Sequence, residues 1–170
     1  MNLPERIDIL IITLSDRAFT GGYDDLSGPK VKEIISGYFS SHNWEYSVSL
    51  TLIPDDAVIL KEHLKSASAK FNIIITTGGT GIGPRDITVE TVTPLLDKEI
   101  PGIMEFIRIK YGTQKPNALL SRGVAGVMGK SLIYTLPGSV RAVDEYMTEI
   151  LKTLMHTIDM QYGIDTHGKH

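Results

Sequence analysis

A short apolar segment that runs directly into a cluster of glycines constrains the fold of this chain more than any other feature. Residues 71–76 are rich in β-branched side chains, which is typical of a strand buried on both faces of a parallel sheet. The glycines follow at once, at Gly78, Gly79, Gly81 and Gly83. A buried strand that ends in a glycine-rich turn before a helix predicts an α/β fold with functional loops at the carboxyl edge of its sheet.

The glycine cluster has the chemistry of an anion-binding loop. Glycines leave the backbone free of Cβ atoms, so amide N–H groups can close around a phosphate, and the Thr80 hydroxyl adds a donor. Arg85 can neutralise a phosphate, and Asp86 can anchor the Mg²⁺ that accompanies it. A second interpretation stays open, in which the glycines only form a tight connection and Asp86 orders its own turn.

Two common nucleotide-binding motifs fail on spacing. The dinucleotide fingerprint G-x-G-x-x-G, started at Gly79, requires a glycine where Pro84 stands. A Walker A motif that ends at residues 129–131 (Gly-Lys-Ser) requires a glycine where Val124 stands. It would also lead into the apolar segment 132–136 rather than into a helix, so we interpret the Gly-Lys-Ser sequence as a turn.

Composition and charge limit the classes of function. The 170 residues suffice for one well-packed domain, and 42% apolar with 22% charged residues is typical of a globular protein. A net charge of −3 offers no broad basic surface for nucleic acid, and the lack of cysteine excludes disulfides, thiolate catalysis and cysteine-ligated metals. We find no signal peptide and no segment of membrane-spanning length, and expect a cytoplasmic protein that binds neither nucleic acid nor a membrane.

Strands alternate with helices along the chain. Apolar or alternating segments predict strands at residues 7–14, 46–52 (at a sheet edge), 71–76 and 132–136. Helical periodicity predicts helices from Pro29 to Phe39, from Asp55 (as N-cap) to Ala67, from Thr88 (as cap) to Asp97, from Ile103 to Tyr111, and from a Ser139 cap to Ile158. This order predicts a three-layer αβα single domain with a mostly parallel central sheet over residues 1–162, followed by a flexible tail, 163–170.

Two further patterns concern surfaces. Residues 15–17 (Ser-Asp-Arg) follow the first strand, so their side chains are expected at the carboxyl edge where α/β folds bind ligands. The apolar residues of the helix at 103–111 occupy more than one stripe, which favours either deep burial or self-association. Asp55, judged alone, is better explained as a helix cap than as a functional residue.

Several segments together resemble one protein family. They are Ser15-Asp16-Arg17, Ile53-Pro54-Asp55, Thr77-Gly78-Gly79-Thr80-Gly81 with Arg85-Asp86, Lys115-Pro116, Leu120-Ser121-Arg122 and Leu136-Pro137-Gly138-Ser139. In this order and spacing, across residues 7–158, the chain resembles the MogA/MoaB family of molybdenum cofactor biosynthesis proteins, to which the G domain of gephyrin is related. It departs from the family pattern D-x-T-P-E-A because Thr88 is followed by Val89.

The resemblance implies a molybdopterin-binding fold that forms a homo-oligomer, a trimer or a hexamer, and transfers AMP from ATP to the terminal phosphate of molybdopterin with Mg²⁺. It implies catalytic and metal-binding roles for Asp55 and Asp86. By position it also implies nucleotide or phosphate binding by Gly78, Gly79, Thr80, Gly81, Pro137, Gly138 and Ser139, and a pterin pocket that includes Ser15, Asp16, Ser121 and Arg122.

The resemblance leaves the activity open between two readings. Members named MoaB share the fold and most motifs, and where MogA is also present they do not perform the transfer. A second possible function is therefore that of a pterin- or nucleotide-binding protein of the same pathway. Such a protein would act with other cofactor biosynthesis proteins but would not catalyse the transfer. The residues alone also allow an unrelated nucleotide-dependent phosphotransferase, because in-line phosphoryl chemistry needs positioning and charge neutralisation rather than a His or Cys nucleophile.

Overall fold

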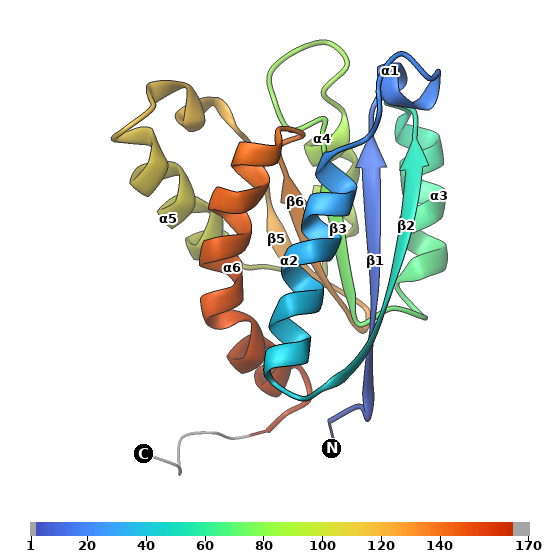
Figure 1. Cartoon of the computed structure of the whole chain (residues 1–170), viewed down its shortest axis with the longest axis vertical. Helices are drawn as coiled ribbons and strands as arrows, with labels where there is room; N and C mark the ends of the chain where they lie inside the picture. Colours follow the sequence, from blue (N-terminus) through green and yellow to red (C-terminus); the bar gives the residue numbers. More distant parts are fainter. Residues whose placement is uncertain (1–2, 165–170) are drawn as a thin grey trace.

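A computed structural model describes residues 3–164, which form a six-stranded sheet with helices on both faces (Figure 1). The strands are β1 (Arg6–Leu14), β2 (Glu45–Ile53), β3 (Ile73–Thr77), β4 (Lys98–Glu99), β5 (Ala125–Met128) and β6 (Ser131–Leu136). The helices are α1 (Asp16–Phe19), α2 (Ser27–Ser41), α3 (Ala57–Ala67), α4 (Thr88–Val92), α5 (Pro101–Gly112) and α6 (Val140–Gln161), with 3-10 helices η1 (Thr93–Leu95) and η2 (Pro116–Leu120). Most of the expected tail, residues 165–170, lies outside the described residues.

The sheet is mostly parallel, in the order β2-β1-β3-β6-β5-β4. β1 pairs in parallel with β2 and β3, and β3 pairs in parallel with β6, so the carboxyl ends of these four strands meet at one edge. The edge position expected for β2 is confirmed. The antiparallel strands β4 and β5 are not predicted by the sequence, because they are short and Gly126 interrupts their pattern. That glycine is needed, since a Cβ atom there would approach the Lys98 carbonyl oxygen to 2.4 Å.

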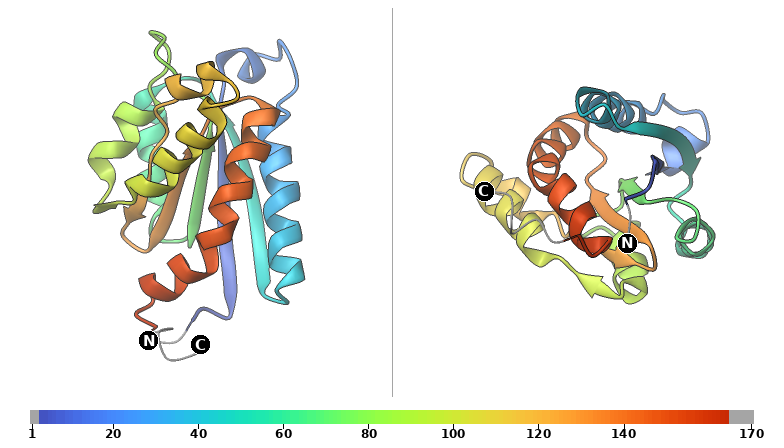
Figure 2. Two further views of the ribbon diagram at one scale, coloured as in Figure 1. Left: turned by 90° about the vertical axis from the view of Figure 1, so that its left-hand side faces the viewer. Right: turned by 90° about the horizontal axis from the view of Figure 1, so that it is seen from below.

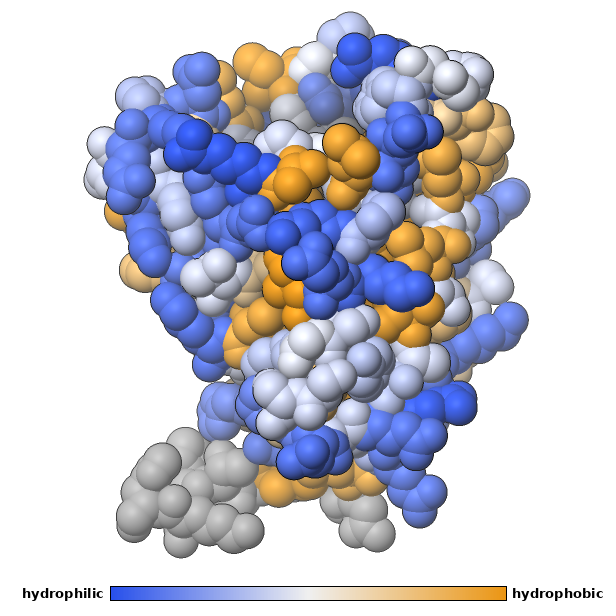
Figure 3. All heavy atoms as spheres, viewed as in Figure 1, coloured by the Kyte–Doolittle hydropathy of each residue, from blue (hydrophilic) through white to orange (hydrophobic). Residues whose placement is uncertain are grey.

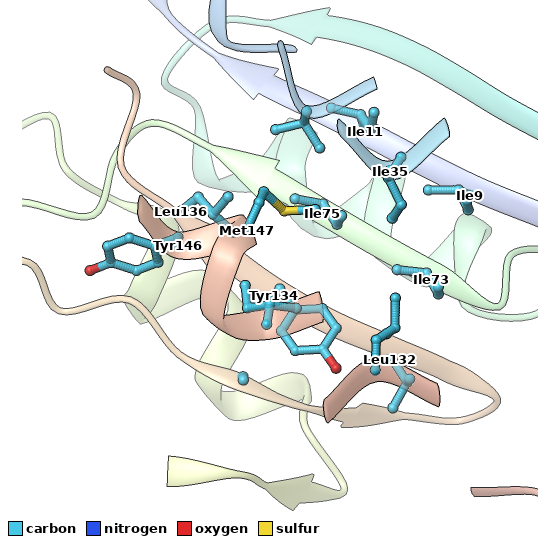
Figure 4. Packing of buried hydrophobic residues seen from close by; sticks show 14 of the residues in the cluster. Ile9, Ile11, Ile35, Ile73, Ile75, Leu132, Tyr134, Leu136, Tyr146 and Met147 are labelled. Atoms are coloured by element: carbon cyan, nitrogen blue, oxygen red, sulfur yellow. The ribbon is translucent and has the colours of Figure 1, made fainter. Parts of the chain in front are cut away.

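Alternate residues of the central strands build two separate cores. Ile9 and Ile11 of β1 pack toward α2, α5 and α6, whereas Leu10 and Ile12 pack toward α3 and α4. Figure 4 shows Met147 of α6 inserted among the side chains of β3 and β6 in the first core. Figure 2 shows α2 and α6 side by side on the same face of the sheet. One sheet between two helical layers confirms the three-layer αβα architecture.

The predicted N-cap of α3 is wrong by one residue. Asp56, not Asp55, caps the helix, because its side chain accepts hydrogen bonds from the backbone N–H groups of Val58 (2.8 Å) and Ile59 (3.0 Å). Both aspartates suit a cap chemically, so the sequence alone does not separate them. The carboxylate of Asp55 is thereby available to accept a hydrogen bond from the backbone N–H of Asp16, the first residue of α1.

The helix after the glycine loop also differs from its prediction. Thr88 is the first residue of α4 rather than its cap, and its hydroxyl donates to the carbonyl oxygen of Gly78 at 2.8 Å. The α-helix ends at Val92 instead of near Asp97 and passes into η1, because Pro94 has no N–H to continue the α-helical hydrogen bonds. The Ser139 cap of α6 is confirmed, since its side chain accepts from the N–H of Ala142.

The surface is polar over much of its area but carries exposed apolar residues on α5. Figure 3 shows the face that carries α2 and α6 as largely hydrophilic, with hydrophobic residues in scattered patches. On α5, Met104 and Ile107 are buried, while Phe106 and Ile109 are 54% and 64% exposed. The two stripes expected for this helix are therefore present, one buried and one at the surface. Within residues 3–164, no helix combines the length and apolar character needed to cross a membrane.

Candidate active site

The carboxyl ends of β1 and β2 and the loop that follows β3 surround a hollow of about 330 Å³, which we name the acidic hollow. These segments lie at the top of the molecule in Figure 1. The lining combines carboxylates with arginines, and consists of Leu14, Ser15, Asp16, Arg17, Tyr23, Asp55, Gly79, Arg85 and Asp86. Asp55 and Asp86, distant in sequence, thus share one hollow.

Asp16 connects three segments of the chain at this hollow. Its backbone N–H donates to Asp55 Oδ2, and the Asp55 N–H donates in return to Asp16 Oδ1, each at 3.0 Å. Arg85 donates to Asp16 Oδ2 from Nε at 3.0 Å and from Nη2 at 2.6 Å. The pKa of Asp16 lies below its usual value. The main cause is the hydrogen bond from the Asp55 N–H, and the second is the hydrogen bond from the Arg85 guanidinium, so Asp16 is ionised at neutral pH.

Asp86 orders its own loop through one of its two oxygens. Asp86 Oδ2 accepts from the Gly83 N–H at 2.7 Å, and a Cβ atom on Gly81 would approach the same oxygen to 2.7 Å. Asp55 likewise accepts its hydrogen bond, from the Asp16 N–H, through Oδ2. Among the described residues, no donor reaches Oδ1 of either aspartate. The turn-forming interpretation of Asp86 is therefore compatible with a second role through Oδ1.

The glycines at the end of β3 are required by backbone geometry. Gly78 and Gly79 have φ values of +96° and +66°, in the left-handed region that favours glycine. A Cβ atom on Gly78 would approach the Leu14 carbonyl oxygen to 2.3 Å, and one on Gly79 would approach Thr88 Oγ1 to 2.4 Å. Side chains at these positions would therefore separate the loop from β1 and α4.

The same loop presents hydrogen-bond donors without acceptors. In the part of the chain that the structure describes, the backbone N–H groups of Gly79, Thr80 and Gly81 find no acceptor. The Thr80 hydroxyl also makes no hydrogen bond there, although the residue is only 3% exposed. Unpaired amides in a glycine turn are the arrangement that holds an oxyanion in a protein.

A second hollow, of about 250 Å³, lies beside the acidic hollow, and we name it the loop hollow. Its lining comes from the end of β1, the loop before α2 and the start of α6, and consists of Thr13, Leu14, Ser15, Ala18, Tyr23, Asp24, Asp25, Leu26, Ser27, Gly138, Ser139 and Val140. A Cβ atom on Gly138 would be 3.3 Å from the Gly78 Cα atom, so the loop after β6 contacts the loop after β3.

A third hollow, of about 360 Å³, is the arginine hollow. Its lining consists of Glu99, Pro101, Met104, Arg108, Leu119, Ser121, Arg122, Gly123, Val124 and Ala125. Arg122 donates from Nε to the Gly81 carbonyl oxygen at 2.8 Å and from Nη1 to Glu90, whose pKa this ion pair holds below its usual value. Ser121 accepts a hydrogen bond from the Tyr146 hydroxyl at 2.9 Å. Arg122 therefore braces the glycine loop from this hollow.

The structure divides the four residues expected in the pterin pocket between two places. Ser15 and Asp16 line the acidic hollow, whereas Ser121 and Arg122 line the arginine hollow. The glycine loop connects the two, because the Arg122 N–H and Nε donate to the carbonyl oxygens of Thr80 and Gly81.

Sequence reasoning missed three residues that line these hollows. Tyr23 and Asp25 stand between the first predicted strand and the first predicted helix, in a segment with no assigned role, and Arg108 stands in a helix whose pattern drew attention only to its apolar stripes. For the first two a signal was present, since their loop follows the polar residues at the end of the first strand. No comparable signal marks Arg108.

The carboxylates fit the Mg²⁺ that the resemblance implies. Within residues 3–164, no group of three or more His, Cys, Asp or Glu side chains could hold a metal ion by itself. Mg²⁺ at nucleotide sites takes only one or two carboxylates and completes its shell with water and substrate phosphates. Asp55 and Asp86, each with an unpaired Oδ1 at the same hollow, meet this requirement.

Comparisons with known proteins identify the family of this chain. Residues 10–157 match the family described as "Probable molybdopterin binding domain". A molybdopterin adenylyltransferase from Helicobacter pylori strain J99 is 32% identical over 162 residues, which cover 94% of this chain and 90% of that protein. A molybdenum cofactor biosynthesis protein B from Staphylococcus carnosus is 38% identical over 155 residues, which cover 89% of this chain and 88% of that protein.

Other relatives are much longer. The chain spans 26% of the length of the Drosophila melanogaster protein cinnamon and 22% of Dictyostelium discoideum gephyrin, with 34% and 36% identity over 158 residues. Among solved structures, MoaB from Thermus thermophilus has a TM-score of 0.82 and 35% identity, and the similarity covers 92% of this chain and 97% of that one. On the match of residues 10–157 and this agreement in fold, the chain belongs to the molybdopterin-binding domain family of molybdenum cofactor biosynthesis proteins.

Proposed function

We propose that this protein transfers AMP from ATP to the terminal phosphate of molybdopterin and releases pyrophosphate, with Mg²⁺ as the accompanying metal. The observation that carries the proposal is the set of unpaired N–H groups at residues 79–81 beside Asp55 and Asp86. Family membership supports a place in molybdenum cofactor biosynthesis. The Helicobacter pylori relative, named a molybdopterin adenylyltransferase, supports the specific reaction.

The reaction is an in-line displacement at the α-phosphorus of ATP. A phosphate oxygen of molybdopterin forms a bond to that phosphorus, the bond to the bridging oxygen of the β-phosphate breaks, and pyrophosphate leaves with the electron pair. The unpaired amides of residues 79–81 hold phosphate oxygens, and Arg85 supplies a neutralising cation. Asp55 and Asp86 hold Mg²⁺, which when bound neutralises charge on the phosphates. Positioning accounts for the remainder of the catalysis.

In this proposal each substrate binds in its own part of the site. The nucleotide takes residues 78–81 and 137–139, which contact one another. The pterin takes the arginine hollow at Ser121 and Arg122, and its phosphate reaches Ser15 and Asp16 in the acidic hollow, where the two substrates meet.

The proposal includes a homo-oligomer, a trimer or a hexamer. Support comes from the exposed apolar residues of α5 and η2, namely Phe106, Ile109, Leu119 and Leu120. A cytoplasmic location and contacts with other cofactor biosynthesis proteins belong to the same proposal, since ATP and the pterin must both be supplied. Light scattering on the purified chain measures the subunit number.

A second function has an observation in its favour. The Staphylococcus carnosus relative, at 38% identity, and the Thermus thermophilus structure, at a TM-score of 0.82, both carry MoaB-type names. In this alternative the protein binds pterin or nucleotide in the same hollows without transferring AMP.

One assay separates these functions. The purified protein is incubated with molybdopterin, ATP and Mg²⁺, and adenylylated molybdopterin and pyrophosphate are measured. Formation of both products supports the transferase. Binding of the ligands without product supports the non-catalytic protein, and ATP turnover that does not depend on pterin indicates a phosphotransferase of another class.

A further inference from the structure

One aromatic side chain lies at the boundary of the acidic hollow and the loop hollow. Tyr23, which is 46% exposed, lines both of them. Among the described residues that line either hollow, it is the only Phe, Trp or Tyr. Any ligand that extends from one hollow into the other passes its ring.

The ring of Tyr23 is held in place although it belongs to a loop. Its hydroxyl oxygen lies 2.8 Å from Ser15 Oγ, and the guanidinium carbon of Arg17 lies 5.2 Å from the ring centroid, within the range of a cation–π contact. Both partners come from the end of β1 and the start of α1. The ring is therefore positioned before a ligand binds, which lowers the entropic cost of using it.

The neighbouring Asp25 anchors this loop and is not itself available to a ligand. Asp25 Oδ1 accepts from the N–H groups of Ser27 (3.0 Å) and Gly28 (3.1 Å), and Oδ2 accepts from the Thr13 hydroxyl at 2.7 Å. A Cβ atom on Gly28 would approach Asp25 Oδ2 to 2.5 Å, so the anchor requires glycine there. With both oxygens used, Asp25 ties the loop that carries Tyr23 to β1.

The two hollows differ in chemistry. The acidic hollow holds the arginines and carboxylates suited to a phosphate chain with its metal. The loop hollow contains no arginine, and its lining combines apolar side chains such as Leu26 and Val140 with the hydroxyls of Ser27 and Ser139 and the carboxylates of Asp24 and Asp25. A flat heterocycle with a few polar edges fits that second lining.

We infer that Tyr23 binds the nucleotide by stacking on the purine base of ATP, with the base in the loop hollow and the phosphates in the acidic hollow. The inference rests on the proposed use of ATP. The purine is assigned here because Gly138 and Ser139, on the segment proposed to bind nucleotide, line the loop hollow. Stacking on an aromatic ring depends on the base and not on the phosphates.

Calorimetric titration of the full chain with ATP and, separately, with tripolyphosphate, each with Mg²⁺, tests the inference. Tyr23→Ala is expected to raise the Kd for ATP about tenfold and to leave the Kd for tripolyphosphate unchanged. Tyr23→Phe keeps the ring and is expected to bind ATP within about twofold of wild type. Phe19→Ala is the matched control, because Phe19 is an exposed aromatic residue of α1 that lines neither hollow, and its affinity for ATP should not change.

The other outcomes contradict the inference in distinguishable ways. Unchanged ATP affinity in Tyr23→Ala overturns it and leaves the proposed transfer intact. An equal loss for ATP and tripolyphosphate shows that the residue acts on phosphates, and a loss in Tyr23→Phe as large as in Tyr23→Ala assigns the effect to the hydroxyl. Wild-type protein that binds no ATP contradicts the proposed function and this inference together.

Discussion

Asp16 and Glu149 are two of the carboxylates that pair with cations in this protein, and their surroundings are very different. Asp16 and Arg85 lie at the acidic hollow, with side chains 40% and 66% exposed. The side chain of Glu149, on α6, is 3% exposed and contacts Lys110 of α5 at 2.6 Å and Lys152 of its own helix at 2.8 Å. The pKa of each carboxyl is below its usual value, so an ion pair with a shifted pKa does not by itself identify a functional site.

The causes of the two shifts differ. Burial acts to raise the pKa of Glu149, but the hydrogen bonds from Lys110 and Lys152 outweigh it and the pKa falls. That cluster is self-contained and ties α5 to α6. Around Asp16, by contrast, Asp55 and Asp86 each keep an unpaired oxygen and the glycine loop keeps unpaired amides. Unsatisfied groups beside the ion pair therefore mark the candidate site.

The largest effect is expected from Asp86→Asn. The amide keeps an oxygen to accept from Gly83 but loses the charge for Mg²⁺, so adenylyl transfer should fall about a hundredfold while the fold is kept. The measurement is the initial rate of pyrophosphate release, with circular dichroism as the check on folding. Asp144→Asn removes an exposed carboxylate that pairs with Lys30 and is the matched control. A wild-type rate in folded Asp86→Asn would remove Asp86 from the site.

Glu149→Ala tests the buried cluster of Glu149 with Lys110 and Lys152. Loss of the carboxylate leaves Lys110 and Lys152 without their shared partner, so the free energy of unfolding should fall by about 2 kcal/mol. This is less than the cost of breaking a fully buried ion pair, because both lysines retain access to water. Urea unfolding measures the change. Glu145→Ala, which breaks an exposed i,i+4 pair with Arg141 one turn earlier, should cost only about 0.4 kcal/mol.

Transfer activity per folded molecule should be unchanged in Glu149→Ala. A large loss of activity at unchanged stability would place Glu149 in the site. The Glu149 cluster would then no longer differ in function from the groups around Asp16.

Arg85→Gln should reduce transfer by about tenfold, because a cation beside the phosphates is lost. The free energy of unfolding should change by less than about 1 kcal/mol, since the Arg85 side chain is 66% exposed. Rates and urea midpoints of the same preparation measure both quantities. If Arg85→Gln instead destabilised the protein as much as Glu149→Ala, the pair with Asp16 would be structural.

The smallest effect is the pH dependence of the Glu149 cluster. Because the folded pKa of Glu149 lies below its ordinary value of 4.5, its stabilisation is complete above pH 4.5 and is lost as the pH falls through the folded pKa. The difference in unfolding free energy between wild type and Glu149→Gln should therefore shrink between pH 7 and pH 3. A difference that stayed constant over this range would show that the Glu149 charge contributes nothing.

Several elements were predictable because local chemistry determines them. The strand and glycine loop at residues 71–83 combine a buried apolar segment with positive φ angles at Gly78 and Gly79, which other residues rarely adopt. The Ser139 cap of α6 follows in the same way from a hydroxyl before a periodic segment. The short strands β4 and β5 were not predictable, since their pairing depends on the contact of Gly126 with the Lys98 carbonyl.

Asp55 shows why part of the candidate site was predicted with the wrong local role. Both Asp55 and Asp56 can cap α3, and the choice is made by Asp16, 39 residues away, which exchanges two hydrogen bonds with Asp55. The contact of Arg85 with Asp16 spans 69 residues and has no signature in either segment. Local patterns contain no information about such pairs.

The sequence by itself determined the alternation of strands and helices, the position of the glycine loop after a buried strand, and the presence of polar residues at strand ends. These features follow from periodicity and from the φ angles that each residue type tolerates. Only the tertiary structure decided that Asp55 and Asp86 share a hollow, that Ser121 and Arg122 line another, and that Tyr23 lies between two of them. The physical reason is that parallel strand ends meet through pairing and packing of distant segments, which fixes distances that no local pattern specifies.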